Sequence, residues 1–531
     1  MPLSWLTCNS VFLGFSRSTF RSAIQAVPQP VRLRACQLSC HRRSGHNAEF
    51  KSALHKEPPL SRNAFIGRED DLIRIWTSLR PQPSLTRRQV AMVHGPDGVG
   101  KSRLAMHFSE LHKGDFCSIW WAHGKDKNSV LASLAALASR VPTDEATSTL
   151  RINAQSKCPT LEGQASMVLE WLSREENSQW LLIFDDVVAD SDPSVESGSG
   201  DAFSIRDFFP WSDNGSILAT TTEPGMDEVG GVHALSRLSP QESLQLFDLG
   251  IESPPGDGLG GHVEDPARKL LVHQLDGLPL ALTQAASYIR QTGQSISSYQ
   301  RLFQVTRQTL QETTEQEYDS AVVTCALSFE QIHQSHPLAA KLLLLFSCYN
   351  NAGIPTSLLE CERDDPALPN WFGNSASLEG RFVKELRTLS DFSLITSLDN
   401  NTGTCSMHPA VKRWCQGNID AKEAEELNTA ALILLGRAAA EALTNKGSPA
   451  GNQQLLLPHA NEMRRILQSG SGVVSSNEQS LLAIRNLGSL YKDQGCLAHA
   501  EYMYLCALSR AQGLFGQSHV SPLVRSCSGF E

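Results

Sequence analysis

The order of apolar and polar positions becomes regular after Phe65, where short apolar runs alternate with amphipathic stretches. The apolar runs predict four strands, over residues 89–94, 117–124, 180–187 and 215–223. The amphipathic stretches predict helices in the segment that ends at residue 112 and over residues 129–141 and 166–176. Because the strands lack a polar face and alternate with helices, this pattern predicts a parallel sheet covered by helices on both faces.

Beyond about residue 236 the pattern predicts almost only helices. One run, Ala339–Tyr349, is strongly apolar, but it is shorter than the roughly 18 residues that span a bilayer and it carries Lys341. We therefore predict a buried helix there, and no membrane span.

Residues 484–512 have the spacing of one tetratricopeptide unit. The positions that such a unit packs between its two helices are Leu487, Gly488, Tyr491, Ala500, Tyr504 and Ala507. A single repeat cannot bury both of its faces, and about three are needed for stability. We therefore expect a truncated array, in which weaker helices earlier in the chain form part of the stack. A generic helical hairpin is the alternative.

Composition and charge indicate a globular protein in a reducing compartment and count against a nucleic-acid partner. Charged residues make up 19% of the chain and apolar residues 41%, as in ordinary globular proteins. The net charge is −10, yet the first 50 residues hold six Arg, no Lys and one acid, about +5, so the remainder is near −10 − 5 = −15. An acidic body repels phosphate backbones, so we expect no nucleic-acid partner. The 13 cysteines lack paired spacing, which indicates a reducing compartment.

The first 60 residues are basic and rich in Arg and Ser, and we expect a disordered leader. A mitochondrial presequence is the alternative, with Phe15–Ile24 as its short amphipathic helix. We expect a cytoplasmic protein, with the mitochondrion as the second compartment. Cys36, Cys40, His41 and His46 form a local cluster, but a zinc site needs four well-placed ligands, and ordinary residues in a loose tail explain it better.

The stretch "HGPDGVGKSR" matches the pattern G-x-x-x-x-G-K-[ST] of a phosphate-binding loop, here called the P-loop (residues 95–102), between a predicted strand and a predicted helix. Its glycines permit backbone angles closed to other residues and let amide groups surround phosphate oxygens. Lys101 would reach the terminal phosphates and the Ser102 hydroxyl would bind Mg²⁺. The expected nucleotide-binding residues here are Gly95, Gly98, Val99, Gly100, Lys101, Ser102 and Arg103. A glycine turn before a helix is the alternative.

A P-loop site needs an acid at the end of a second buried strand, and "LLIFDD" supplies two. Asp185 and Asp186 are the expected catalytic residues. Asp185 would hold Mg²⁺ through water, and Asp186 would polarise an attacking water. A helix cap or a turn is the alternative for two adjacent acids after a strand.

The order of motifs resembles the NB-ARC ATPases, the STAND-class switch proteins of apoptotic and NOD-like immune receptors. The motifs are "FIGREDDL", the P-loop, "LLIFDD", "GSILATT", "GLPLAL" and "MHP". The fungal branch, in which such a core precedes tetratricopeptide repeats, is the most similar. The resemblance runs from about residue 62 to the C-terminus and implies an α/β P-loop NTPase core, an all-α domain, a winged helix and short α-helical repeats.

The resemblance also implies roles for residues outside the P-loop. The family's segment that matches Phe65–Arg68 lies beside the adenine, which assigns Ile66 and Arg68 to the nucleotide site. Pro279 of the GLPL motif would pack on the base, and His408 of "MHP" would touch the β-phosphate of ADP.

With these motifs, five segments are expected. They are a leader (1–60), a P-loop domain (61–235), a helical subdomain with GLPL (236–317), a winged-helix-like domain with MHP (318–420) and a helical region (421–531) with one repeat at about 484–517.

Two positions depart from the family's pattern. The family commonly has Arg after its "ITT" strand, whereas this chain has Thr222, and Pro409 replaces the aspartate of the "MHD" form. The first change concerns the sensing of the γ-phosphate, so we expect at most a slow ATPase.

The resemblance implies an ADP/ATP-binding switch in innate immune signalling, with Mg²⁺ as the metal. ADP would hold the closed state, and ATP exchange would permit self-association. Its other partner would be a protein or peptide bound by the repeats. Two alternatives stay open: a helical-repeat scaffold with a degenerate nucleotide site, and a transcription regulator built on the same core, against which the acidic balance counts.

Overall fold

The computed structural model describes most of the chain after residue 64. The described residues are 65–81, 87–141, 160–188, 203–223, 230–251, 266–313, 319–360, 367–373, 382–396, 403–444, 451–470 and 474–515. The leader with its Phe15–Ile24 helix and its Cys/His cluster lies outside them.

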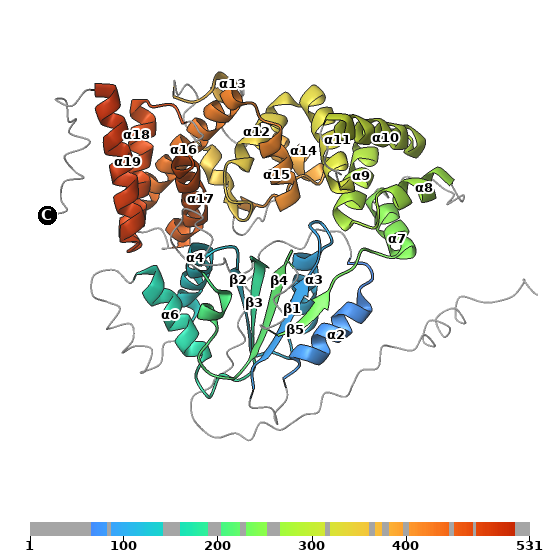
Figure 1. Cartoon of the computed structure of the whole chain (residues 1–531), viewed down its shortest axis with the longest axis horizontal. Helices are drawn as coiled ribbons and strands as arrows, with labels where there is room; N and C mark the ends of the chain where they lie inside the picture. Colours follow the sequence, from blue (N-terminus) through green and yellow to red (C-terminus); the bar gives the residue numbers. More distant parts are fainter. Residues whose placement is uncertain are drawn as a thin grey trace, which may run out of the picture. The chain divides into compact units, whose positions relative to one another are not determined.

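A five-stranded parallel sheet forms the first part of the described chain (Figure 1). Its strand order is β2-β3-β4-β1-β5, and every neighbouring pair is parallel. The strands are β1 (Gln89–His94), β2 (Ser118–His123), β3 (Trp180–Val187), β4 (Ser216–Thr221) and β5 (Gly231–Ala234). β1 therefore lies between β4 and β5, and the P-loop follows it directly.

Both faces of this sheet are covered, as the continuous apolar strands predict. Alternate residues of β3 enter two separate cores: Leu181 and Ile183 one core, Leu182 and Phe184 the other. The first core includes residues of α2 (Glu69–Leu79) and α3 (Lys101–Leu111), and the second includes residues of α4 (Lys127–Leu137) and α6 (Leu161–Leu172). The α/β interpretation of this region is confirmed.

Several predicted boundaries are wrong. α4 starts earlier than expected because Asp126 caps it by accepting a hydrogen bond from the Ser129 amide, and it ends at Leu137, before the short 3₁₀ helix η2 (Ala138–Arg140). α6 starts at residue 161 because Thr160 supplies its N-cap, and it ends at residue 172 rather than 176, with Ser173 as its C-cap. β2 and β4 are also shorter than predicted.

β5 is absent from the predicted strands because its four residues are largely exposed and show no apolar run. A 3₁₀ helix, η3 (Ile205–Phe208), lies between β3 and β4.

Helices dominate the described residues after β5, as predicted (Figure 1). The first group is α7 (Pro240–Ile251), α8 (Pro266–Gln274), α9 (Pro279–Thr292), α10 (Ile296–Thr313) and α11 (Ser320–Ser335). The buried helix expected at residues 339–349 is α12 (Pro337–Ser347). Among the described helices, none is long and apolar enough to cross a membrane.

A small antiparallel sheet follows α12. It pairs β6 (Ile354–Pro355) with β7 (Thr404–Cys405), and an isolated bridge joins Ile395 to Met407. The remaining elements of this segment are η4 (Thr356–Leu359), α13 (Asn370–Gly373), α14 (Val383–Asp391) and α15 (Pro409–Gly417). α15 begins at the "MHP" motif, with His408 as its N-cap.

Four longer helices complete the described chain: α16 (Ala421–Thr444), α17 (Gly451–Gln468), α18 (Glu478–Asp493) and α19 (Leu497–Phe515). α18 and α19 form a helical hairpin, in which Leu487, Tyr491 and Ala500 are buried. A methyl group on Gly488 would lie 2.7 Å from the Tyr504 ring, so only glycine permits this close approach. The predicted packing positions of the hairpin are therefore confirmed, whereas its assignment as a tetratricopeptide unit stays a prediction.

Candidate functional site

The P-loop connects β1 to α3 with two residues in the left-handed region. Gly98 has φ 78° and Gly100, which precedes the first residue of α3, has φ 97°. These angles favour glycine and turn the chain sharply into the helix. The free amides and the positive dipole end of α3 therefore face the loop, as an anion site requires.

Lys101 is the first residue of α3 and is buried. Its ammonium group donates to the Gly95 carbonyl at 2.8 Å and to the Pro96 carbonyl at 3.1 Å, so the side chain folds back over the loop. Burial lowers the pKa of Lys101, and nearby Asp97 partly opposes this shift. An anion bound beside the ammonium group would favour its charged form, which burial disfavours.

Asp185 lies at an irregularity between β3 and β4, where the register shifts after Phe184. Its carboxylate is buried and accepts a 2.6 Å hydrogen bond from the Thr220 hydroxyl on β4. The same hydroxyl accepts from the Asp186 amide at 2.9 Å. Thr220 thus holds the two adjacent acids in place, a role that the sequence analysis missed.

Asp186 has a left-handed backbone, with φ 63°, which is uncommon for a residue other than glycine. Burial raises the pKa of its carboxyl group, and the negative charge of Asp185 raises it further. A carboxylate with a raised pKa accepts a proton more readily than an ordinary aspartate does, which suits the general-base role predicted for it.

Three further predicted residues lie around this cluster. Ser102 follows Lys101 in α3 and is half-buried, and burial lowers the pKa of Arg103 beside it. Thr222 is exposed just beyond the end of β4. A threonine carries no charge, so this position offers no electrostatic attraction to a terminal phosphate.

Arg68 ties the segment before α2 to the P-loop. Its guanidinium donates to the Val99 carbonyl at 3.2 Å and to the Ser236 carbonyl at 2.5 Å. Its own backbone is left-handed, with φ 71°, and its amide donates to Glu242. The structure therefore places Arg68 against the loop backbone, while Ile66 packs half-buried against the main core.

The GLPL motif contacts the P-loop directly. Pro279 is the first residue of α9, where its missing amide costs no helical hydrogen bond. The Leu280 amide donates to the Gly98 carbonyl at 3.3 Å, and a methyl group on Gly98 would lie 3.2 Å from the Leu280 β-carbon. A methyl group on Gly100 would lie 3.9 Å from the Pro279 ring.

His408 brings a third segment to the loop. Its Nδ1 accepts a hydrogen bond from the Ala410 amide at 3.1 Å, which caps α15. Burial lowers the pKa of His408 to about 4, and the charges that act on it are Asp97, Lys101 and Arg413. Arg413, one turn along α15, forms an ion pair with Asp97 of the P-loop.

The structure thus brings the predicted P-loop, acid, GLPL and MHP residues to one edge of the sheet. The missed members are Thr220, Asp97, Leu280 and Arg413. Two of them had a sequence signal: Asp97 is an acid inside a loop expected to bind anions, and Leu280 belongs to the GLPL motif. Arg413 lies 316 residues away from it along the chain, and no local pattern connects the two.

These residues fit a nucleotide with Mg²⁺. The loop offers glycine amides and a buried ammonium group to phosphates, and the Asp185 carboxylate and the Ser102 hydroxyl are oxygen donors of the kind Mg²⁺ takes. No cluster of three or more potential metal ligands of the His, Cys, Asp and Glu types occurs among the described residues.

Comparisons with known proteins give one sequence relative. No family model matches the chain. A curated protein of Hyaloscypha variabilis, named a nucleotide-binding leucine-rich repeat (NLR)-like protein, is 26% identical over 502 residues. The match covers 88% of this chain and 46% of that protein, so the chain spans about half the length of its curated relative.

Solved structures resemble the chain only loosely. Cdc6p of Pyrobaculum aerophilum has a TM-score of 0.32 and 14% identity, and covers 68% of this chain and 97% of its own. The ORC1 protein of Aeropyrum pernix, solved in complex with DNA, has a TM-score of 0.27 and 13% identity, with 68% and 95% covered.

Proposed function

We propose that this chain is a nucleotide-operated switch of the NLR type, in which ADP holds a closed state and ATP exchange permits oligomerisation and signalling. The relative's name supports the class, and the P-loop supports the ligand. The observation that carries the proposal is that three separate segments meet at the P-loop: residues 65–68, the start of α9 and the start of α15.

In this proposal each segment holds one part of the nucleotide. The P-loop amides (Gly95 to Ser102) and Lys101 hold the phosphates, and Ser102 with Asp185 holds Mg²⁺, which would offset the phosphate charge. Pro279 packs on the base, and His408 contacts the β-phosphate.

A ligand that touches all three segments binds their closed arrangement better than an open one. That difference in affinity is what shifts the equilibrium between the two states. The nucleotide therefore acts as a structural part of the closed state, and its release or exchange frees α15 from the P-loop.

Hydrolysis is proposed to be slow and to reset the switch. Asp186, with its raised pKa, is the residue available to take a proton from water. Thr222 supplies no positive charge toward a terminal phosphate, which supports a slow rate.

The domain organisation remains part of the proposal. The helices over residues 236–317, the small sheet with α15 over 318–420 and the helical pairs over 421–531 support a helical subdomain, a winged-helix-like domain and repeats. A cytoplasmic place and a role in innate immune signalling follow from the same proposal, as does a protein or peptide ligand for the repeats.

The test is to purify the chain without added nucleotide, denature it and identify the released nucleotide. We expect ADP in near-stoichiometric amount, and a rise in mass in solution after ATP addition. Lys101→Ala should lose both, because the ammonium group that faces the phosphates is gone.

Lys113→Ala is the matched control, since Lys113 lies just beyond the same helix, is 62% exposed and pairs with Glu110. A chain that holds no nucleotide and whose melting temperature is unchanged by ADP would contradict the proposal. That result would favour the alternative of a helical-repeat scaffold with a degenerate nucleotide site. The uncharged Thr222 supports this alternative, which predicts that Lys101→Ala leaves assembly and partner binding unchanged.

A further inference from the structure

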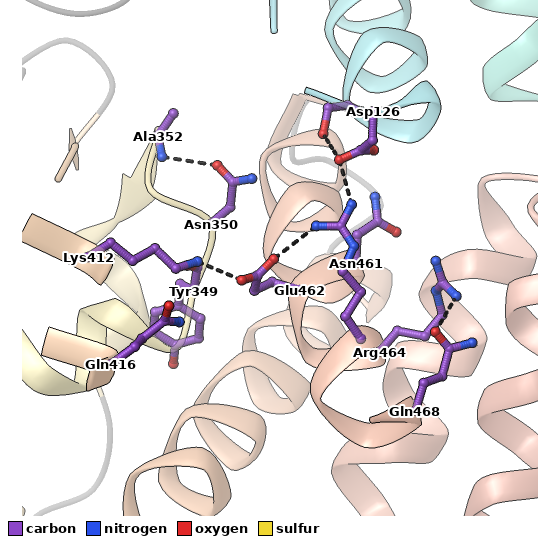
Figure 2. Close-up of polar contacts among 12 residues, drawn as sticks. Asp126, Tyr349, Asn350, Ala352, Lys412, Gln416, Asn461, Glu462, Arg464 and Gln468 are labelled. Carbon is purple, nitrogen blue, oxygen red and sulfur yellow. Dashed lines mark hydrogen bonds and ion pairs between the residues drawn. The ribbon is translucent and has the colours of Figure 1, made fainter. Parts of the chain in front are cut away.

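Four charged side chains form a continuous chain across three elements (Figure 2). Lys412 of α15 contacts Glu462 of α17 at 2.6 Å, from its ammonium nitrogen to Oε1. The other carboxylate oxygen of Glu462 lies 3.1 Å from Nη1 of Arg465. Nη2 of Arg465 lies 2.7 Å from Oδ2 of Asp126, the N-cap of α4. These four residues are called the charge chain below.

Within the charge chain, Lys412 and Glu462 are shielded from water, whereas Asp126 and Arg465 are partly exposed. The side chains of Lys412 and Glu462 are 6% and 13% exposed, those of Asp126 and Arg465 21% and 40%. Two cations alternate with two anions, so these four side chains together carry no net charge. A charge shielded as Lys412 and Glu462 are is tolerated only while it is paired, so these two depend on each other.

The two acids are held in their charged form. Burial alone would raise the pKa of Glu462, but the charge and hydrogen bond of Lys412 outweigh it and the pKa is lowered. At Asp126, burial is likewise outweighed by Arg465 and by hydrogen bonds from Ser129. Both carboxylates are therefore ionised near neutral pH. Burial lowers the pKa of Lys412, and the charge and hydrogen bond of Glu462 oppose this shift.

Further contacts hold the C-terminal helices against the same part of the sheet domain. Gln454 of α17 donates to Gln164 of α6 at 2.8 Å, and the Leu161 amide donates to the Gln494 carbonyl at 3.1 Å. A methyl group on Gly495 would lie 2.5 Å from Thr160, the cap of α6, so the chain approaches closely there. α17 and the turn after α18 thus dock at the starts of α4 and α6.

The other end of the charge chain leads to the nucleotide site. Lys412 is adjacent to Arg413, which pairs with Asp97 of the P-loop, and both follow His408 in α15. Lys412 also donates to the Tyr349 carbonyl at 2.5 Å, which fixes its position. α15 is therefore held by the P-loop on one side and by α17 on the other.

We propose that Glu462 and Arg465 are positioning residues that couple the nucleotide site to the docking of α17 on α4. They hold α15 through Lys412 and the sheet domain through Asp126, so release of α17 loosens α15 from the P-loop. Because coupling between two sites is reciprocal, nucleotide in the P-loop also strengthens the docking of α17. This inference rests on the proposed function, since it needs ADP to contact α15.

The test compares two substitutions at the sheet-domain end of the charge chain, the end that does not belong to α15. Asp126→Asn removes the charge but keeps an N-cap, because asparagine caps a helix as well as aspartate does. Arg465→Gln removes its partner. Each variant should bind ADP with Mg²⁺ at least about fivefold more weakly than the wild type by calorimetry, the lower end of ordinary coupling. The double variant should be no weaker than the weaker single variant, because both changes break the same pair.

Arg464→Gln is the matched control, since Arg464 lies on the same helix and donates to Gln468 of its own helix (Figure 2). It should bind ADP within about twofold of the wild type. Hydrogen exchange of the unmodified chain is the second measurement, and it does not depend on how any variant folds. ADP should slow amide exchange in α17 and at the start of α4.

The outcomes separate this inference from the proposed function. A wild-type chain that binds neither ADP nor ATP overturns both. A wild-type chain that binds ADP, while the two variants bind it equally well and α17 exchanges at the same rate with and without ADP, overturns the coupling alone.

Discussion

Two adjacent residues of α15 reach the sheet domain in contrasting ways. Arg413 is 62% exposed and pairs directly with Asp97 of the P-loop. Lys412 is 6% exposed and reaches Asp126 only through Glu462 and Arg465. Consecutive residues on a helix point about 100° apart, so a single helix presents one charge to solvent and the next to the interior.

The contrast indicates different roles for the two contacts, one that can open and close and one that positions the helices. An exposed ion pair contributes roughly 0–1 kcal/mol and is screened by salt, so it opens and closes easily. A buried pair adds little over an apolar contact, but the loss of one partner leaves a charge shielded from water. The exposed pair at the P-loop therefore suits a contact that changes with the nucleotide, and the charge chain fixes how the helices dock.

Substitution of a shielded member of the charge chain should have the largest effect on the free energy of unfolding. Glu462→Gln leaves Lys412 and Arg465 without their shared carboxylate, and we expect the free energy of unfolding to fall by about 3 kcal/mol. Urea denaturation measures this change. Glu441→Gln, at an exposed position near the end of α16, is the control and should stay within about 0.5 kcal/mol. A loss of less than about 1 kcal/mol at Glu462 would mean that water already reaches the charge chain.

His408 and the charge chain should lose their contributions to the free energy of unfolding in different pH ranges. The pKa of His408 is about 4 in the folded chain against 6.5 ordinarily, so between these values the unfolded chain binds the proton and the folded chain does not. The stability contributed by His408 is complete above pH 6.5 and is lost as the pH falls toward 4. Protonation would also break the cap from the Ala410 amide.

Between pH 7 and pH 5 the free energy of unfolding of the wild type should therefore fall by about 1–2 kcal/mol more than that of His408→Gln. This range allows for partial exposure of the ring. Denaturation curves at several pH values measure the difference. Equal slopes in the two proteins would show that His408 is no more buried in the folded chain than in the unfolded one.

The charge chain should respond only in acid. The pKa values of Asp126 and Glu462 are lowered on folding, so their contribution is complete above their ordinary values near 4 and is lost as the pH falls through the lower folded values. From pH 5 to pH 3, Asp126→Asn should lose about 1 kcal/mol less stability than the wild type. The same denaturation series measures it, and a difference already present between pH 7 and 5 would contradict the assignment.

Sequence patterns predicted the sheet core because its signals are local. The strand at Trp180–Val187 is a continuous apolar run, and the P-loop combines glycines with Lys101 and Ser102 within eight residues. β5 was missed because its exposed residues carry no apolar pattern, and helix boundaries shifted where a cap such as Thr160 decided them.

The second half of the site was less accessible to sequence patterns. The contact of Thr220 with Asp185 depends on β3 and β4 being neighbours, and strand order cannot be read from apolar periodicity. The ion pairs of Lys412 and Arg413 join residues that only the packing of α15 brings together. A basic residue in an amphipathic helix looks the same in sequence whether its partner is water or a distant carboxylate.

The smallest effect should come from the exposed pair, and salt is the way to isolate it. Arg413→Gln and Asp97→Asn should each lower the free energy of unfolding by less than about 1 kcal/mol in dilute buffer. In 1 M salt, where the screening length is about 3 Å, the difference from the wild type should vanish. The loss in Glu462→Gln should persist under the same conditions, because shielded charges are screened much less. A loss at Arg413 that survives 1 M salt would mean that the P-loop pair is closed to solvent, and the two sides of α15 would then be equivalent.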